Sequence, residues 1–254
     1  VGAYLDHVRP DLIVNPAAYT AVDKAEEERS TAFAVNHLSP ALIAQWCAAN
    51  DVALIHYSTD YVYDGQGEEP FREDAPANPV GVYGQSKLAG DQAVATSGAS
   101  YLILRTSWVY GARGKNFLNT MLRLAESSNQ LRVVDDQIGA PTPARLLADA
   151  TTVLLARHGS RARDLRPLLG TYHLVPTGWV SWHGFAQQIM RLRLELTGNQ
   201  SPTVQAITTA DFPTAAARPA NSRLSTDKAT QQLGLQLPDW QSALRLVMGQ
   251  RLQA

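Results

Sequence analysis

The sequence has few residues that could cross-link the fold through covalent bonds or a metal. Cys47 is the one cysteine among 254 residues, so the chain cannot form an internal disulfide. The six histidines show no HxH or HxxxH spacing, which argues against a catalytic metal site. No apolar run is long enough to cross a bilayer, and no signal-peptide pattern is present. These absences favour a cytoplasmic protein.

An excess of charge of one sign is also missing. The chain has 22 Lys and Arg against 23 Asp and Glu, a formal net charge of −1. This balance gives no electrostatic reason to expect nucleic acid or an anionic membrane as a partner. The arginine-rich segment 157–166 is better explained as a solvated loop.

A glycine-rich phosphate-binding turn is not found. Nucleotide-binding α/β domains usually open with an apolar strand and such a turn at a helix N-terminus. This chain has no GxGxxG or GxxGxxG and starts with a helical pattern over residues 1–8. We interpret the sequence as lacking its amino-terminal segment. The alternative is a protein that never had the turn, which would leave an exposed sheet edge.

Short apolar runs alternate with helical patterns along the chain. Runs such as Leu12-Ile13-Val14 are typical of strands buried on both faces of a parallel sheet. Residues 23–50 carry a long helical pattern, with a break near Ser39-Pro40, and residues 79–96 carry another. The pattern predicts an α/β fold, a doubly wound parallel sheet with a smaller α/β lobe near the C-terminus.

The most informative run joins a strand end to a helix start. Ser58-Thr59-Asp60-Tyr61 follows the apolar run 52–57, at the sheet edge where open α/β sheets bind ligands. Tyr83 and Lys87 are four residues apart, so a helix presents them on one face.

The residue types in this run suit proton transfer. An ammonium beside Tyr83 favours the phenolate and lowers the phenol pKa from about 10. The tuned phenol can exchange a proton with a substrate oxygen, which the Thr59 hydroxyl can hold. A lone YxxxK is usually a solvated Lys beside a half-buried Tyr, but the preceding strand favours the functional interpretation. No GxSxG elbow is present, which disfavours acyl transfer.

Six longer segments, spread over nearly the whole chain, carry a family resemblance. They are Val14–Glu26, His56–Tyr63, Tyr83–Gly90, Arg105–Tyr110, Asp136–Thr142 and Arg218–Leu224. Together they resemble the extended short-chain dehydrogenase/reductase superfamily, with its Rossmann-like sheet. More narrowly, they are similar to the dTDP-4-dehydrorhamnose reductase family.

The resemblance implies a reaction and a set of site residues. The reaction is NAD(P)H-dependent reduction of the C4 ketone of dTDP-4-dehydro-L-rhamnose to dTDP-L-rhamnose, a precursor of cell-surface polysaccharide. Tyr83, Lys87 and Thr59 would be catalytic, with Tyr83 as proton donor. Thr59, Asp60 and Trp108 would bind the substrate sugar. The implied cofactor contacts are Ala18, Tyr19, Thr20, Tyr57, Tyr83 and Lys87.

The resemblance also divides the chain and suggests partners. Residues 1–175 would form the dinucleotide-binding domain, incomplete at its N-terminus, and 176–254 mainly the substrate-binding lobe. Segment 111–142 would contribute to the substrate site. The family suggests a homodimer, in some members with Mg²⁺ at the interface. The choice between NADH and NADPH depends on a strand that this chain does not include.

Two alternatives stay open. One is a cofactor-binding regulatory subunit of the methionine adenosyltransferase type, which has a similar fold; the intact Thr59, Tyr83 and Lys87 set argues against it. The other is a nucleotide-sugar epimerase of the same superfamily, which would release no net oxidised cofactor.

Overall fold

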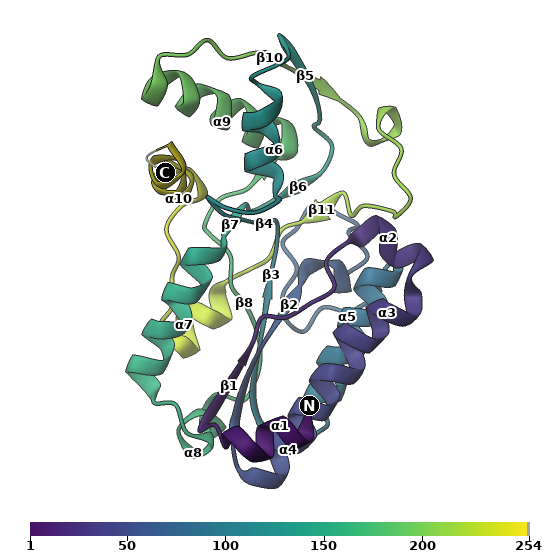
Figure 1. Cartoon of the computed structure of the whole chain (residues 1–254), viewed down its shortest axis with the longest axis vertical. Helices are drawn as coiled ribbons and strands as arrows, with labels where there is room; N and C mark the ends of the chain where they lie inside the picture. The colour runs from purple at the N-terminus through teal and green to yellow at the C-terminus, as the bar shows by residue number, and fades with distance from the viewer. Residues whose placement is uncertain (253–254) are drawn as a thin grey trace.

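A parallel four-stranded sheet lies at the centre of the larger lobe in the computed structural model, which describes residues 1–252 (Figure 1). The strand order is β1-β2-β3-β8, and each neighbouring pair is parallel. The strands are β1 (Leu12–Asn15), β2 (Ala53–Thr59), β3 (Ser100–Thr106) and β8 (Gly170–His173). The inner strands β2 and β3 are buried on both faces, as their continuous apolar runs indicate. The predicted α/β fold with a parallel sheet is confirmed.

Helices cover both faces of this sheet. One face packs against α4 (Ser39–Asn50) and α5 (Val82–Ala95). The other packs against α7 (Ala144–His158), α8 (Ala162–Leu165) and the π-helix η5 (Ala229–Leu233). Successive strand residues point to opposite faces. Leu54 therefore joins the core under α4 and α5, whereas Ala53 and Ile55 join the core under α7. The same alternation sends His56 towards α5 and Tyr57 towards α7.

The segment before β2 is not the single broken helix that its pattern predicts. It forms α2 (Val22–Glu27), α3 (Arg29–Phe33), the π-helix η1 (Ala34–Leu38) and α4. The break falls at Glu28, where φ is −102° and ψ is 43°, and not at Ser39-Pro40, where the backbone stays helical. Pro40 lies in the first turn of α4, and because the backbone before it is already helical, its missing N–H interrupts the hydrogen bonding between η1 and α4.

A second lobe lies beyond the sheet edge at which β2 and β3 end (Figure 1). Strands β5 (Gln130–Val134) and β10 (Thr203–Ile207) pair in parallel and pack against three helices. The helices are α6 (Phe117–Leu124), α9 (Trp182–Thr197) and α10 (Trp240–Leu252). Their shared core is centred on Phe185, Ile189 and Leu244, none of which is exposed.

The remaining elements are short: one helix lies at the N-terminus, and five two-residue strands follow later in the chain. They are α1 (Gly2–Val8), β4 (Val109–Tyr110), β6 (Ile138–Gly139), β7 (Thr142–Pro143), β9 (Val180–Ser181) and β11 (Asn221–Ser222). Strands β4 and β7 pair with each other, and β11, β6 and β9 form a small sheet. Among the helices of residues 1–252, none combines the length and hydropathy needed to cross a bilayer.

Helix α5 lies very close to its neighbours because two of its residues are glycines. A Cβ at Gly84 would overlap the carbonyl oxygen of Tyr61, and one at Gly90 would overlap the carbonyl oxygen of Asn36. The helix therefore presses against both the turn after β2 and the π-helix. These two contacts fix the positions of Tyr83 and Lys87 relative to the carboxyl end of β2.

We expect Gly84→Ala to destabilise the chain by about 1–3 kcal/mol, because the backbone of Tyr61 must move to admit the methyl group. Gly249→Ala is the matched control, since Gly249 lies within α10 and a Cβ there meets nothing within 4 Å. That change should stabilise by about 0.5–1 kcal/mol through helix propensity. Urea unfolding of both variants gives the comparison. Equal stabilisation by the two alanines would show that α5 has room at residue 84.

Candidate active site

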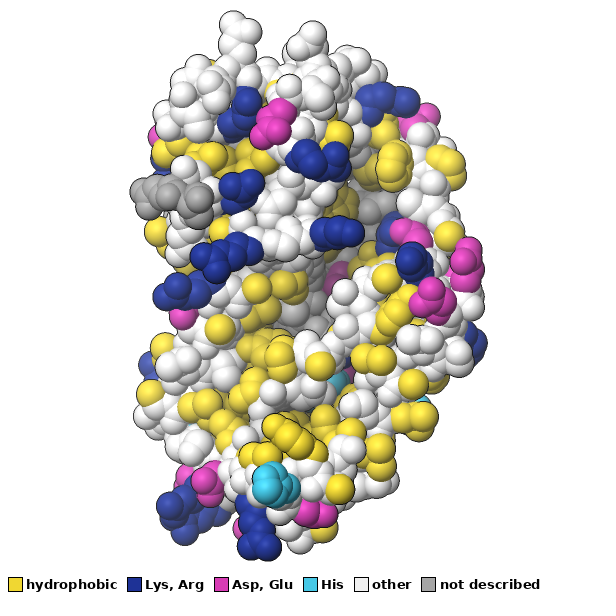
Figure 2. Space-filling model, in the orientation of Figure 1, with side chains coloured by type: hydrophobic (Ala, Val, Ile, Leu, Met, Phe, Trp, Pro, Cys, Tyr) yellow, Lys and Arg dark blue, Asp and Glu magenta, His cyan; other side chains and the backbone are white. Residues whose placement is uncertain are grey.

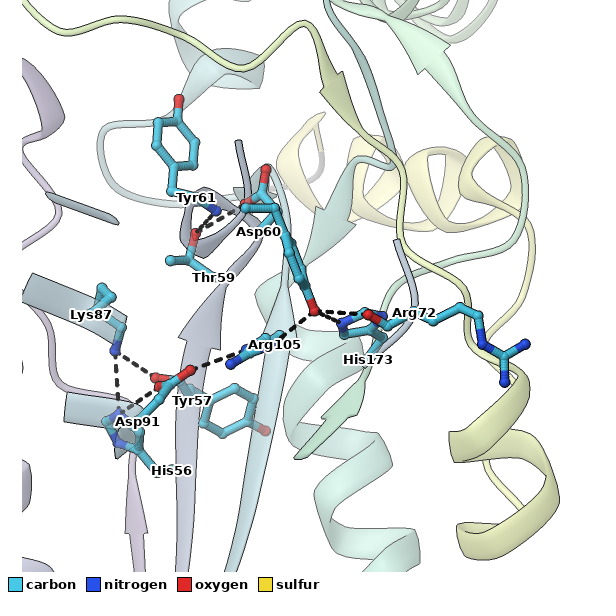
Figure 3. Close-up of polar contacts among 11 residues, drawn as sticks. His56, Tyr57, Thr59, Asp60, Tyr61, Arg72, Lys87, Asp91, Arg105 and His173 are labelled. Carbon is cyan, nitrogen blue, oxygen red and sulfur yellow. Dashed lines mark hydrogen bonds and ion pairs between the residues drawn. The ribbon is translucent and has the colours of Figure 1, made fainter. Parts of the chain in front are cut away.

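The carboxyl end of β2 presents two buried polar side chains. Thr59 and Asp60 are 6% and 4% exposed. The Thr59 hydroxyl donates to Asp60 Oδ1 over 2.9 Å (Figure 3). On the other side, Ser222 Oγ of β11 donates to Asp60 Oδ2 over 2.5 Å. Burial raises the pKa of Asp60 to about 6, although both hydrogen bonds act to lower it. Asp60 therefore links β2 to the loop that carries β11 and fixes the Thr59 hydroxyl.

Tyr83 opens α5 beside these residues. Its ring packs edge-on against Tyr61, with 5.4 Å between ring centroids and an interplanar angle of 76°. Burial raises the pKa of the Tyr83 phenol well above its usual value, and a hydrogen bond with Thr59 lowers it only in part. This direction is opposite to the expected lowering by Lys87. In the chain as it stands, the phenol keeps its proton.

Lys87 is buried one turn further along α5. It is 2% exposed, and its Nζ donates to the carbonyl oxygen of Tyr57 over 2.7 Å (Figure 3). Burial lowers the pKa of Lys87 to about 8, and the Asp91 carboxylate acts in the opposite direction. The Lys87 ammonium therefore loses its proton more easily than that of an exposed lysine.

The loop after β1 lies near the same helix through a buried asparagine. Asn36 accepts a hydrogen bond from the Tyr19 backbone N–H at 2.8 Å and donates to the Tyr19 carbonyl oxygen at 3.1 Å. Its side chain also donates to Ser86 Oγ of α5 over 3.0 Å. Asn36 is fully buried, so it ties the Ala18-Tyr19-Thr20 loop to α5. Nothing in the local sequence pattern distinguishes Asn36, so it is not among the predicted site residues.

Two other candidate residues lie apart from this cluster. The Tyr57 phenol is on the α7 side of the sheet, where it donates to the Leu147 carbonyl oxygen over 3.0 Å. Only its backbone carbonyl meets Lys87. Trp108 stacks on Trp182 of the second lobe, with 3.6 Å between ring centroids and an angle of 11°. Its φ of 49° is rare for a non-glycine residue and is the kind of strain that clusters at functional sites.

A cavity of about 490 Å³ connects Tyr61 to the second lobe. Its aromatic lining is Phe117, Trp182 and Phe212, and its cations are Arg132 and Arg218. Arg218 also pairs with Asp23 of α2 at 2.6 Å, and so ties the loop 208–220 across to the larger lobe. The space-filling view shows the surface hollowed between the lobes, with Lys and Arg side chains around the hollow (Figure 2). Its size suits a small-molecule ligand.

Comparison with known proteins identifies the family. The family model described as the RmlD substrate binding domain matches residues 1–252. The dTDP-4-dehydrorhamnose reductase of Shigella flexneri is 45% identical over 250 residues, which cover 96% of this chain and 80% of that protein. This chain belongs to the dTDP-4-dehydrorhamnose reductase family.

Solved structures of the reductase family agree with this assignment. One from Clostridium acetobutylicum superposes with a TM-score of 0.90 at 33% identity, covering 100% of this chain and 85% of that one. One from Bacillus anthracis, in complex with NADP, gives a TM-score of 0.88 at 34% identity, covering 98% and 84%. The resemblance to the reductase family and the Rossmann-like fold are confirmed.

Several expectations stay predictions for this member of the reductase family. The individual roles of Thr59, Asp60, Tyr83, Lys87 and Trp108 are among them. So are a homodimer and Mg²⁺ at its interface. Within residues 1–252, no group of three or more His, Cys, Asp or Glu side chains is placed to hold a metal ion.

Proposed function

We propose that this chain reduces the C4 ketone of dTDP-4-dehydro-L-rhamnose to dTDP-L-rhamnose with NADPH or NADH. The observation that carries the proposal is the grouping of Thr59, Tyr83 and Lys87 at the end of β2, beside a cavity of about 490 Å³. Relatives that are 45% identical are named for this reaction. The NADP complex of a relative that is 34% identical supports the cofactor class.

The residues at this end of the sheet fit a nicotinamide cofactor, which would supply the hydride. Ala17 and Ala18 leave room for close approach, and Asn36 holds the Tyr19 backbone beside α5. Lys87 uses one N–H on the Tyr57 carbonyl oxygen, so further N–H groups are free to donate to a ribose hydroxyl. The Tyr57 ring is on the opposite face, so any contribution of Tyr57 at this site runs through its carbonyl oxygen.

Tyr83 is suited to donate the proton in the reducing direction. A raised pKa keeps its phenol protonated at neutral pH, which is the form that a ketone needs when it becomes an alkoxide. An alkoxide is a stronger base than a phenolate, so the transfer runs downhill. The Lys87 cation on the next turn then stabilises the phenolate that remains.

Thr59 and Asp60 would hold the reacting ketone. The Thr59 hydroxyl proton is shared with Asp60 in the substrate-free chain. We expect the substrate carbonyl to compete with Asp60 for this proton, which places the carbonyl beside the Tyr83 hydroxyl. Trp108 acts from the other side, through its stack on Trp182 at the cavity wall.

The cavity would hold the nucleotide part of the substrate. Aromatic faces such as Phe117 and Trp182 suit a thymine ring, and the guanidinium groups of Arg132 and Arg218 suit a diphosphate. We propose residues 1–175 as the cofactor domain and 176–254 as mainly the substrate lobe, with 111–142 contributing to the substrate wall. Segment 111–142 supplies β5 and α6 of the second core, while 229–237 packs back on the sheet.

The family assignment favours a reductase over the two alternatives. The relatives from Shigella flexneri, Clostridium acetobutylicum and Bacillus anthracis are all named dTDP-4-dehydrorhamnose reductase. We propose a cytoplasmic location, where nucleotide sugars and NADPH are formed, and a homodimeric state.

The direct test is turnover of dTDP-4-dehydro-L-rhamnose with NADPH and with NADH. We expect stoichiometric loss of reduced cofactor and formation of dTDP-L-rhamnose. An epimerase would change the sugar without net cofactor oxidation. A regulatory subunit would bind cofactor and leave the sugar unchanged. Either result would overturn the proposed function.

A further inference from the structure

A third residue shares the face of α5 that carries Tyr83 and Lys87. Asp91 is four residues beyond Lys87, so the three side chains lie on successive turns of one helix face. Asp91 is 2% exposed, and it faces neither solvent nor the cavity between the lobes. A carboxylate in such a place needs partners, because burying an unpaired charge is costly.

The two oxygens of Asp91 have different surroundings (Figure 3). Oδ2 accepts a hydrogen bond from Arg105 Nε of β3 over 3.1 Å. Oδ1 has no hydrogen-bond partner among the described residues and lies 3.9 Å from His56 Nε2. Arg105 is itself held by the Tyr63 hydroxyl over 2.9 Å. The carboxylate is therefore fixed on one side, and its other oxygen lies near His56 Nε2, the ring nitrogen that Lys87 Nζ also approaches.

The tautomer of His56 follows from its second neighbour. Asn15 Oδ1 accepts from the Ala17 N–H over 3.3 Å, which leaves Asn15 Nδ2 facing His56 Nδ1 at 3.2 Å. His56 Nδ1 is then the acceptor, and the ring proton is on Nε2. That N–H faces Asp91 Oδ1. The 3.5 Å approach of Lys87 Nζ to Nε2 is a contact between two donors and does not use up a lysine proton.

The charges around Lys87 leave it one counter-charge. The titratable groups that surround it are Tyr83 and Asp91 on α5, His56 on β2 and, behind Asp91, Arg105 on β3. Burial and the Lys87 charge hold the pKa of His56 well below its usual value, so His56 is neutral. The phenol of Tyr83 is neutral as well. Asp91 is the group that opposes the effect of burial on Lys87.

We propose that Asp91 is the counter-charge that keeps the buried Lys87 ammonium protonated, with Arg105 fixing one of its two carboxylate oxygens. Asp91 acts through Lys87 and is a positioning residue for the proposed reduction, on which this inference rests. Without Asp91, Lys87 loses its proton near neutral pH and can no longer stabilise the Tyr83 phenolate.

The test reads the protonation of Lys87 directly. The chain has four lysines, Lys24, Lys87, Lys115 and Lys228, so lysine labelled with ¹³C at Cε gives few NMR signals. Lys87→Arg assigns the signal of interest. In cofactor-free protein, Asp91→Asn should lower the titration midpoint of Lys87 by about one pH unit or more. Asp149→Asn, which removes an exposed i,i+4 partner of Arg145 on α7, should leave the midpoint unchanged.

Activity gives the second readout. The Asp91→Asn enzyme should lose turnover at a lower pH than the wild type and recover it as the pH falls. A merely structural role would lower activity equally at every pH. Since the NMR midpoint needs no substrate, an inactive wild type would refute the proposed function and leave this inference open to its own measurement. An unchanged midpoint in Asp91→Asn would overturn the inference, whatever the activity.

A second variant covers the case in which Asp91→Asn does not fold because Arg105 is left unpaired. Asp91→Asn combined with Arg105→Gln removes both charges of the buried pair. The double variant still lacks the carboxylate that opposes the effect of burial on Lys87, so its titration midpoint should lie below that of the wild type. A midpoint at the wild-type value in the double variant would refute the proposal.

Discussion

Tyr83→Phe is expected to lower kcat for sugar reduction by about 10²–10⁴. The change removes one hydroxyl and keeps the ring that packs against Tyr61. The alkoxide formed by hydride transfer would then have no positioned proton donor, because Thr59 shares its own proton with Asp60. Stopped-flow measurement of cofactor oxidation at saturating substrate separates kcat from KM. Cofactor affinity should change little, since the proposed ribose contact belongs to Lys87.

Tyr101→Phe is the matched control for this change. Tyr101 is a half-buried phenol near the start of β3, at the other end of the strand from the site. Its loss should leave kcat within a factor of two. Retention of more than a tenth of wild-type kcat in Tyr83→Phe would mean that another group delivers the proton.

The raised pKa of the Tyr83 phenol adds a pH dependence. The protonated phenol is the reactive form, and it persists through neutral and mildly alkaline pH. The group that titrates in this range is Lys87, with its pKa near 8. We therefore expect kcat to fall at alkaline pH as Lys87 loses its proton, and removal of Asp91 should move this fall to lower pH.

The sequence contains enough to place Tyr83, Lys87 and Thr59 together. A spacing of four on a helix and a polar cluster at a strand end are local patterns, and both hold in the structure. Asp91 follows the same spacing, and the pattern would have identified it had the helix face been followed one turn further. The position of the Tyr57 ring could also have been predicted. Side chains alternate along a strand, so the Tyr57 ring must lie on the opposite face of the sheet from the His56 ring.

Other features depend on contacts that no local pattern shows. The Asn36 side chain reaches Ser86 because the π-helix turns it towards α5, and the helical period of 23–50 gives no sign of that turn. The pKa of Tyr83 depends on burial between α5 and the end of β2, a tertiary property. The Lys87 charge can be read from the sequence, whereas the burial that raises the pKa of Tyr83 cannot.

The cavity arginines are the clearest example of this kind. Arg132 lies on β5 and Arg218 on the loop after β10, and only the folded second lobe brings them to one cavity. Replacing both with methionine should lower kcat/KM by about 10²–10⁴, since each charge-assisted contact to a phosphate contributes about 1.5–3 kcal/mol. Most of the loss should lie in KM, because the diphosphate is remote from the reacting ketone.

Arg218 needs a control for its second contact, because Arg218→Met also leaves Asp23 without its partner. Asp23→Asn breaks the same ion pair and keeps the cation in the cavity, so it should leave KM nearly unchanged. Arg245→Met breaks a comparable pair with Glu195 away from the cavity and should have no effect.

Calorimetric titration with dTDP and with thymidine then separates the phosphates from the base. The double arginine variant should bind dTDP at least tenfold more weakly than the wild type and bind thymidine about as well, since the aromatic wall of Phe117 and Trp182 is intact. An equal loss for both ligands would mean that the arginines hold the shape of the cavity and do not contact the diphosphate. In that case the assignment of the cavity to the nucleotide would rest on its aromatic residues alone.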